Sequence, residues 1–239
     1  MTWEEFEEEI ARRGRVDFWW RDDDAGAVVP ALKRTLSISL EHEIPLALAV
    51  VPEAAEPELF GLLHDHVSVL QHGTDHRNRA APGEKKTEYP AAEPLEAALA
   101  RVSDGFGRLR MFAGERFFPA LAPPWNRVRE DMLQKLPAIG IRGVTTYGAR
   151  RRPDPAHGLA QVNTHVDVIA WRRGRHFIGE SQALELALKR LGEEPLGWLT
   201  HHAVQDADTF RFLERLFQVR AIRWLSAPQV FSYTGFRHG

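Results

Sequence analysis

The sequence predicts an α/β protein whose single, mainly parallel sheet closes or nearly closes into a (β/α) barrel. Short apolar segments typical of buried strands alternate with segments of helical periodicity along the chain. The length of 239 residues suits one such barrel. The sequence contains no convincing linker and no internal repeat, so residues 1–239 are expected to form one domain.

The first element in chain order is an amphipathic helix over residues 2–13. Its apolar side chains recur at spacings of three and four: Trp3, Phe6 and Ile10. We expect residues 1–14 to pack on the barrel as an N-terminal helix. Residues 16–21 follow as an aromatic-rich, buried strand that ends at three consecutive aspartates.

The later elements are predicted from the same two patterns, short apolar runs for strands and apolar residues at spacings of three and four for helices. Apolar runs bounded by turn residues predict extended segments at 45–51, 67–71, 117–121, 143–146, 162–171, 177–178, 196–200 and 223–225. Apolar residues at helical spacing predict helices at 31–40, 58–64, 94–111, 128–136, 182–191 and 207–219. This alternation favours parallel strands joined by right-handed crossovers.

The composition excludes several classes of protein. With 31 Lys and Arg against 33 Asp and Glu, the formal net charge is −2, which does not favour a nucleic-acid partner. The absence of cysteine excludes disulfides, zinc fingers and iron–sulfur ligation. The N-terminal segment lacks the regions of a secretory signal, and no apolar run approaches the roughly 18 residues of a membrane span. We therefore expect a cytoplasmic protein with no membrane partner, and the oligomeric state is not predicted.

Reactive side chains follow three of the predicted strands. Asp22, Asp23 and Asp24 follow the first strand, His72 and His76 the third, and His201 and His202 a late one. In a (β/α) barrel the carboxyl ends of the strands meet at one face, where active sites form. The sequence therefore predicts that these groups converge.

The spacing of His72 and His76 is compatible with a metal site. On a helical turn two histidines four residues apart face the same side and can share one ion, and a carboxylate would complete the site. Solvated histidines and an acidic turn, or Asp24 as a helix cap, are the alternatives. We favour the metal, because three adjacent carboxylates at the end of a buried strand need a compensating cation.

Five segments carry a family resemblance through their order and spacing. They are WWRDDDAG (19–26), LQHGTDH (70–76), LAPPWNR (121–127), VDVIAW (166–171) and LTHH (199–202). Together they resemble the motifs of the polysaccharide deacetylases of carbohydrate esterase family 4, the NodB-homology type, and in particular a divergent bacterial branch.

The resemblance implies a distorted (β/α)7 barrel and one divalent cation bound by an aspartate, His72 and His76. It implies Asp22 as general base with Asp23 as metal ligand, although branches written Asp-x-Asp would make Asp24 the ligand. It implies His201 as general acid, with His202 as a close rival. The oxyanion site falls in the third motif: Pro124, Trp125, Asn126 and Arg127. Zn²⁺ is the expected ion, and Co²⁺, Ni²⁺, Fe²⁺ or Mn²⁺ are alternatives.

The sequence also departs from the family pattern. Arg127 follows the third motif instead of preceding it, so no residue is assigned to orient the base, and only Asp167 and Trp171 remain of the fourth motif. The predicted function is a metal-dependent hydrolase that removes an N-acyl, in particular N-acetyl, group from a sugar or small glycan. The alternatives are a C–N hydrolase of a non-sugar amide and a catalytically silent carbohydrate-binding protein.

Overall fold

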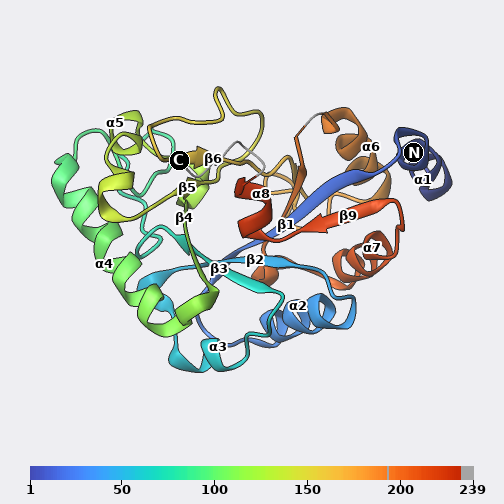
Figure 1. Ribbon diagram of the computed structural model, residues 1–239, viewed down its shortest axis with the longest axis horizontal. Helices are drawn as coiled ribbons and strands as arrows, with labels where there is room; N and C mark the ends of the chain where they lie inside the picture. Colours follow the sequence, from blue (N-terminus) through green and yellow to red (C-terminus); the bar gives the residue numbers. More distant parts are fainter. Residues whose placement is uncertain (193, 233–239) are drawn as a thin grey trace.

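A curved sheet of parallel strands forms the centre of the computed structural model, which describes residues 1–192 and 194–232 (Figure 1). The strands in these residues are β1 (Val16–Ala25), β2 (Leu46–Val50), β3 (Val67–His72), β4 (Phe117–Ala122), β5 (Gly143–Val144), β6 (Ala160–Gln161), β7 (Val166–Asp167), β8 (Leu196–Thr200) and β9 (Ile222–Leu225). Their order is β6-β5-β4-β3-β2-β1-β8-β7, and β9 pairs with β1. The predicted distorted barrel is thereby confirmed. Its sheet has nine strands among the described residues instead of the expected seven, and several of them are only two residues long.

Helices connect the strands and cover the sheet. They are α1 (Trp3–Arg13), α2 (Pro30–Glu41), α3 (Pro57–Gly61), α4 (Leu95–Ala113), α5 (Glu130–Leu133), α6 (Glu180–Arg190), α7 (Ala207–Phe217) and α8 (Ala227–Ser232). Apolar side chains of α1, α2, α6 and α7 share one core with the outward-facing residues of the strands. The short α8 contributes instead to the core on the opposite, inner face of the sheet. None of the described helices is both long and apolar enough to cross a membrane.

Alternation along β1 decides which of its side chains face inward. Trp19 belongs to the inner core, together with small residues such as Ala47 and Ala49 of β2. Phe18 and Trp20 belong to the outer core beneath the helices. Since successive strand residues point to opposite faces, Arg21 and Asp23 share the inner face with Trp19, whereas Asp22 shares the outer face with Trp20.

A bulge near the end of β1 alters this alternation. The predicted strand over 16–21 extends to Ala25, and its register with β2 shifts between Asp22 and Ala25. Asp24 has a left-handed backbone with a φ of 70°. A bulge re-aims the side chain that follows it, so the adjacent Asp23 and Asp24 both reach the carboxyl end of the sheet.

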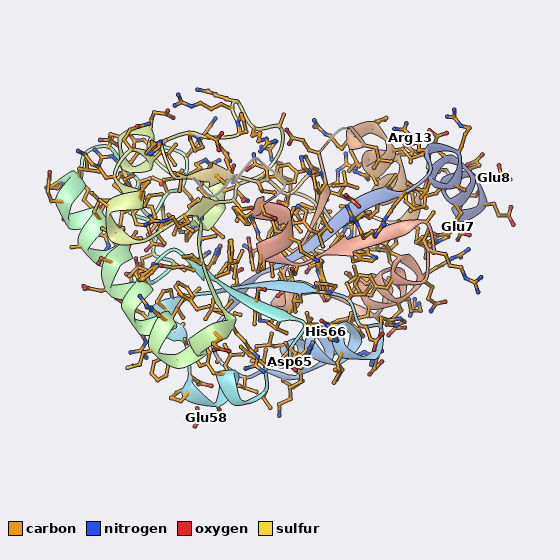
Figure 2. All side chains as sticks on the ribbon, viewed as in Figure 1. Glu7, Glu8, Arg13, Glu58, Asp65 and His66 are labelled. Carbon is orange, nitrogen blue, oxygen red and sulfur yellow. The ribbon has the colours of Figure 1, made fainter. Side chains whose placement is uncertain are left out.

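Most predicted elements are confirmed, but the extended stretch predicted over 162–171 contains only the two-residue strand β7, and β6 precedes it. Further differences concern shorter segments. The N-terminal helix is capped by Thr2 and Glu5, and its exposed Glu7, Glu8 and Arg13 point away from the body (Figure 2). The extended segment at 177–178 contains an isolated bridge between Ile169 and Phe177 and no strand. The helix predicted over 128–136 is interrupted after α5, and a separate short turn, Leu136–Ile139, follows it. Pro137 disfavours a continuous helix there. Helix α8 was not predicted, since its six residues span less than two turns.

Candidate metal centre and its cleft

Asp24, His72 and His76 bring one ligand atom each to a common point. The three ligand atoms lie within 4.8 Å of one another. The Nε2 atoms of His72 and His76 lie 3.0 and 3.1 Å from Asp24 Oδ1, which has no hydrogen bond of good geometry within the described part of the chain. The other ring nitrogen of His72, Nδ1, lies 2.9 Å from the carbonyl oxygen of Ala122. A proton on Nδ1 would leave Nε2 free for a cation, which is the usual arrangement of a metal-binding histidine.

The loop after β3 positions the two histidines. The helical turn on which two histidines four residues apart would face the same side does not occur here: His72 ends a strand, and residues 73–76 form an irregular loop in which His76 has a φ of 55°. Gly73 has a φ of 61°, and a Cβ there would lie 2.1 Å from Glu88 Oε2. Glu88 is fully buried and accepts the backbone N–H groups of Thr74 and Asp75 at 2.8 and 3.2 Å. The loop therefore requires glycine at 73 and a carboxylate at 88.

The electrostatics of this cluster favour a cation. Burial opposes ionisation of Asp24, but the close imidazoles of His72 and His76 hold its pKa well below the usual range. Burial would likewise lower the pKa of His72, yet the charges of Asp23 and Asp24 raise it. A field that retains a proton on a buried imidazole will also attract a divalent ion. The donor set of two imidazoles and a carboxylate fits Zn²⁺ and related ions.

Asp23 lies beside this centre and is held by Arg21. The guanidinium Nη2 of Arg21 donates to Asp23 Oδ2 at 2.9 Å, and its Nε lies 2.9 Å from Oδ1. Arg21 also donates to Thr145 Oγ1 and Asn126 Oδ1, both at 2.8 Å. Both members of the ion pair are buried, with side-chain exposures of 0% for Arg21 and 3% for Asp23. Arg21 therefore orients the Asp23 carboxylate, a role that the sequence left unassigned.

Asp22 points to the outer face of the sheet and away from the cleft. It accepts hydrogen bonds from Thr200 Oγ1 at 2.6 Å and from Gln205 Nε2 at 3.1 Å. Its other oxygen lies 2.6 Å from His202 Nδ1, and the charge of Asp22 raises the pKa of His202 against the opposing effect of burial. This geometry does not fit Asp22 as base, Asp23 as ligand or His202 as acid. Strand alternation is the reason, because Asp22 and Asp23 must face opposite sides.

His201 faces the cleft from the other side of Asp23. Its Nε2 lies 3.9 Å from Asp23 Oδ2, and its ring meets the edge of Trp171 at a centroid distance of 4.6 Å. The Trp171 indole donates to Asp167 Oδ2 at 2.7 Å. Burial raises the pKa of Asp167, while nearby His201 acts in the opposite direction. Asp167 and Trp171, the two residues that remain of the fourth motif, thus line the cleft.

The segment 124–127 forms a further part of the wall. Trp125 and Asn126 both have a φ of 56°, a left-handed conformation that is uncommon for a bulky residue such as Trp125. Trp125 packs on His76 at a centroid distance of 4.7 Å, and Asn126 accepts from Arg21. Arg127 donates to the backbone oxygen of Lys86 at 2.7 Å, whereas Pro124 is buried. Three of the four residues predicted for the oxyanion site therefore line the cleft.

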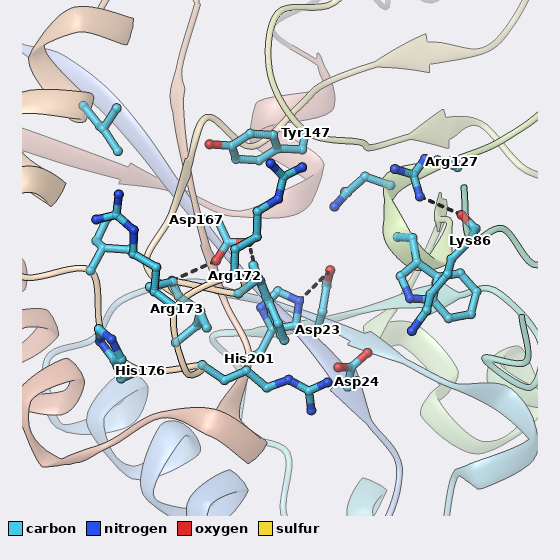
Figure 3. Close-up of a pocket in the computed structure, with 18 of the residues that line it drawn as sticks. Asp23, Asp24, Lys86, Arg127, Tyr147, Asp167, Arg172, Arg173, His176 and His201 are labelled. Atoms are coloured by element: carbon cyan, nitrogen blue, oxygen red, sulfur yellow. Dashed lines mark hydrogen bonds and ion pairs between the residues drawn. The ribbon is translucent and has the colours of Figure 1, made fainter. Parts of the chain in front are cut away.

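These groups surround a cleft with a volume of about 1260 Å³. Figure 3 shows Asp23, Asp24 and His201 near its centre, with Tyr147 and Asp167 above them in that view. Of the predicted residues, the cleft is lined by Asp23, Asp24, His72, His76, Trp125, Asn126, Arg127 and His201. Glu88 was not predicted, because a lone carboxylate in a polar loop gives no signal in the sequence. Arg21 was readable from the sequence, because strand alternation places Arg21 and Asp23 on the same face.

Comparison with known proteins identifies the fold. No family model and no curated protein matches the sequence. A family 4 carbohydrate esterase from Streptomyces lividans matches in structure with a TM-score of 0.58 at 15% identity, covering 88% of this chain and 91% of that one. Peptidoglycan deacetylase PdaC from Bacillus subtilis matches with a TM-score of 0.60 at 11% identity, covering 92% and 91%. A family 4 acetyl xylan esterase from Clostridium thermocellum, in complex with a cobalt ion, matches with a TM-score of 0.60 at 10% identity, covering 91% of each chain.

The chain therefore has the fold of the polysaccharide deacetylases of carbohydrate esterase family 4. The resemblance that the sequence motifs indicate is confirmed at the level of the fold. The low identities agree with a divergent branch.

Proposed function

We propose that this protein is a metal-dependent hydrolase that removes an N-acetyl group from a sugar or glycan, with Zn²⁺ as its ion. The observation that carries the proposal is the convergence of Asp24, His72 and His76 beside a facing carboxylate and imidazole, Asp23 and His201. Two imidazoles and one carboxylate leave coordination positions open for substrate and water, as in catalytic zinc sites.

Each step of the proposed reaction is assigned to a different group of the cleft. When bound, the cation supplies a Lewis acid that polarises the acyl oxygen and acidifies water. Asp23, fixed by Arg21, accepts the proton of the attacking water. His201 donates a proton to the nitrogen of the departing amine, without which the C–N bond breaks slowly. Trp125 lines the same cleft, and its backbone N–H is proposed to share the charge of the oxyanion.

The dimensions and lining of the cleft favour a saccharide. A volume of about 1260 Å³ exceeds the roughly 300 to 1,000 Å³ of pockets for single small molecules. Trp125, Tyr147 and Trp171 line it, and the last two are 44% and 40% exposed. Aromatic faces next to polar groups suit a ligand that is apolar on one face and hydroxylated at its edges.

The test measures bound metal and acetate release together. Purified protein should contain close to one divalent ion per chain by elemental analysis and should release acetate from N-acetylglucosamine oligomers. Asp24→Ala should lose both the ion and the activity. Asp23→Asn should keep the ion and lose roughly 10²- to 10⁴-fold in kcat. Asp104→Asn, an exposed change in α4, is the control and should alter neither.

Other outcomes would contradict parts of the proposal. Activity that survives in Asp23→Asn but disappears in Asp22→Asn, with metal retained, would restore Asp22 as the base. Failure to bind any divalent ion after reconstitution would refute the metal-dependent hydrolase. Metal binding without turnover of N-acetyl sugars, O-acetyl sugars or simple amides would indicate a silent carbohydrate-binding protein.

A further inference from the structure

Basic side chains stand on both sides of the acidic centre of the cleft. Lys86 and Arg127 lie on one side of Asp23 and Asp24, and Arg172 and Arg173 lie on the other (Figure 3). Arg175 also lines the cleft. The chain as a whole carries a formal net charge of −2, so this is a local accumulation of positive charge.

Three of these arginines belong to one hairpin tip, residues 170–176, which we name the arginine loop. The bridge between Ile169 and Phe177 closes it, and Ala170 N–H donates to the His176 carbonyl at 2.8 Å. Arg175 has a φ of 55°, a strained value for a side chain of its size. Trp171, within the loop, contacts both Asp167 and His201. The arginine loop is therefore attached to the proposed catalytic groups and held at the cleft.

The arginines of this loop lack carboxylate partners. Among the described residues, no ion pair or hydrogen bond involves the guanidinium of Arg172, Arg173 or Arg175, and all three are exposed. The three consecutive arginines at 150–152 provide a contrast, because Arg150 pairs with Glu194 and Arg152 with Glu130. Three like charges within four positions repel one another, and an anion between them would relieve that repulsion. The loop thus offers guanidinium donors that the protein itself does not use.

We propose that the substrate carries an anionic group, a carboxylate or a phosphate, in addition to the acyl group, and that the arginine loop binds it. This proposal rests on the deacetylase function proposed above. Guanidinium groups match the two-oxygen edge of either anion, with paired N–H donors in one plane. A neutral glycan would leave the three charges without a counter-ion next to an otherwise polar cleft. The substrate class is therefore an acidic N-acyl sugar, either a uronate or a sugar phosphate.

The experiment compares matched sugars on the full chain loaded with Zn²⁺. The sugars are neutral N-acetylglucosamine oligomers, N-acetylglucosamine 6-phosphate and an N-acetylated hexosaminuronic acid. We expect kcat/KM for at least one acidic sugar to exceed that of the neutral sugar, with the advantage decreasing at high ionic strength. The combined variant Arg172→Gln, Arg173→Gln and Arg175→Gln should lower the ratio of acidic to neutral kcat/KM roughly 10- to 100-fold. The two acidic sugars show which anion is preferred.

A control variant carries the same charge change elsewhere. Arg15, Arg110 and Arg220 are exposed, do not line the cleft and form no ion pair within the described ranges. Replacing these three by glutamine should leave the ratio unchanged. Equal kcat/KM for neutral and acidic sugars, or an equal loss of preference in both triple variants, would overturn the proposal.

A binding measurement separates this proposal from the hydrolase itself. Calorimetric titration with the same three sugars does not need turnover. If nothing is hydrolysed but the acidic sugar binds more tightly and depends on the arginine loop, the anionic ligand stands and the deacetylase proposal fails. If neutral sugars are hydrolysed and acidic ones neither bind more tightly nor react faster, the anionic substrate alone is refuted.

Discussion

Replacing Arg21 by methionine should destabilise the fold by about 3 to 5 kcal/mol, because the change leaves Asp23 as an unpaired, buried carboxylate. The pair has side-chain exposures of 0% and 3%, so solvent cannot take over from the guanidinium. Asp23→Asn should cost less, about 1 to 3 kcal/mol, since Arg21 keeps the hydrogen bonds to Thr145 and Asn126. The double variant removes both charges and should show a favourable coupling of about 1 to 3 kcal/mol.

Urea unfolding of the four proteins measures these differences. A chelator should be present throughout, because a bound cation would add its own stabilisation to the native state. The midpoints and slopes then give the unfolding free energies and the coupling. A cost below about 1 kcal/mol for Arg21→Met would place the pair among solvated ion pairs and refute the reasoning. Strict additivity of the two single changes would refute it as well.

Three further predictions concern the metal loop, a buried histidine and the N-terminal helix. Gly73→Ala should weaken Zn²⁺ binding in a titration, because its Cβ would collide with Glu88 and Pro124, whereas Gly83→Ala, with a φ of 85° and open space around it, should not. His165 is a buried histidine whose Nδ1 accepts the Gly197 N–H at 3.0 Å, and burial lowers its pKa. The stability that its neutral ring contributes is therefore full above the unfolded pKa of about 6.5 and is lost as the pH falls below that value. His165→Asn keeps an acceptor and should lose less stability than the wild type between about pH 7 and pH 5 in urea titrations, and equal losses would count against this assignment. Phe6→Ala should lower the unfolding free energy by about 3 to 5 kcal/mol, since Phe6 lies on the buried face of α1 and is 0% exposed. A loss under about 1 kcal/mol would show that the helix is not part of the cooperative core.

The architecture could be predicted because it depends on the pattern of apolar and polar residues, which is visible in the sequence. Apolar runs and helical periodicity located most strands and helices, since burial on one face imposes those patterns. The ends of elements were less predictable. β1 continues through three aspartates, which strand propensity disfavours, because pairing with β2 and β8 holds that part of the strand extended.

The site could be predicted as a cluster but not in its detailed roles. The convergence of the aspartates and histidines followed from the position of reactive groups at strand ends. The assignment within the cluster depended on alternation and on a bulge. The alternation of side chains between the two faces of the sheet could be applied to β1 once Trp19 and Trp20 were recognised as strand residues. The bulge that turns Asp24 toward His72 depends on pairing with β2, and the sequence of β1 alone does not encode that pairing. Glu88 lies in a loop whose conformation is determined by contacts with segments distant in the sequence, so its role could not be predicted.

The position of β1 has a consequence for how the protein can accommodate different ligands. β1 is bonded to three neighbouring strands, and Asp22 ties its end to Thr200 and Gln205. The adjoining Asp23 and Asp24 thus stand on a strand held by three neighbours, whereas the arginine loop on the facing wall is closed by an isolated bridge, so we expect the cleft to adjust to a different ligand mainly through that loop. Variation in ligand preference among close homologues should accordingly concentrate in residues 170–176 and leave the acidic strand end unaltered.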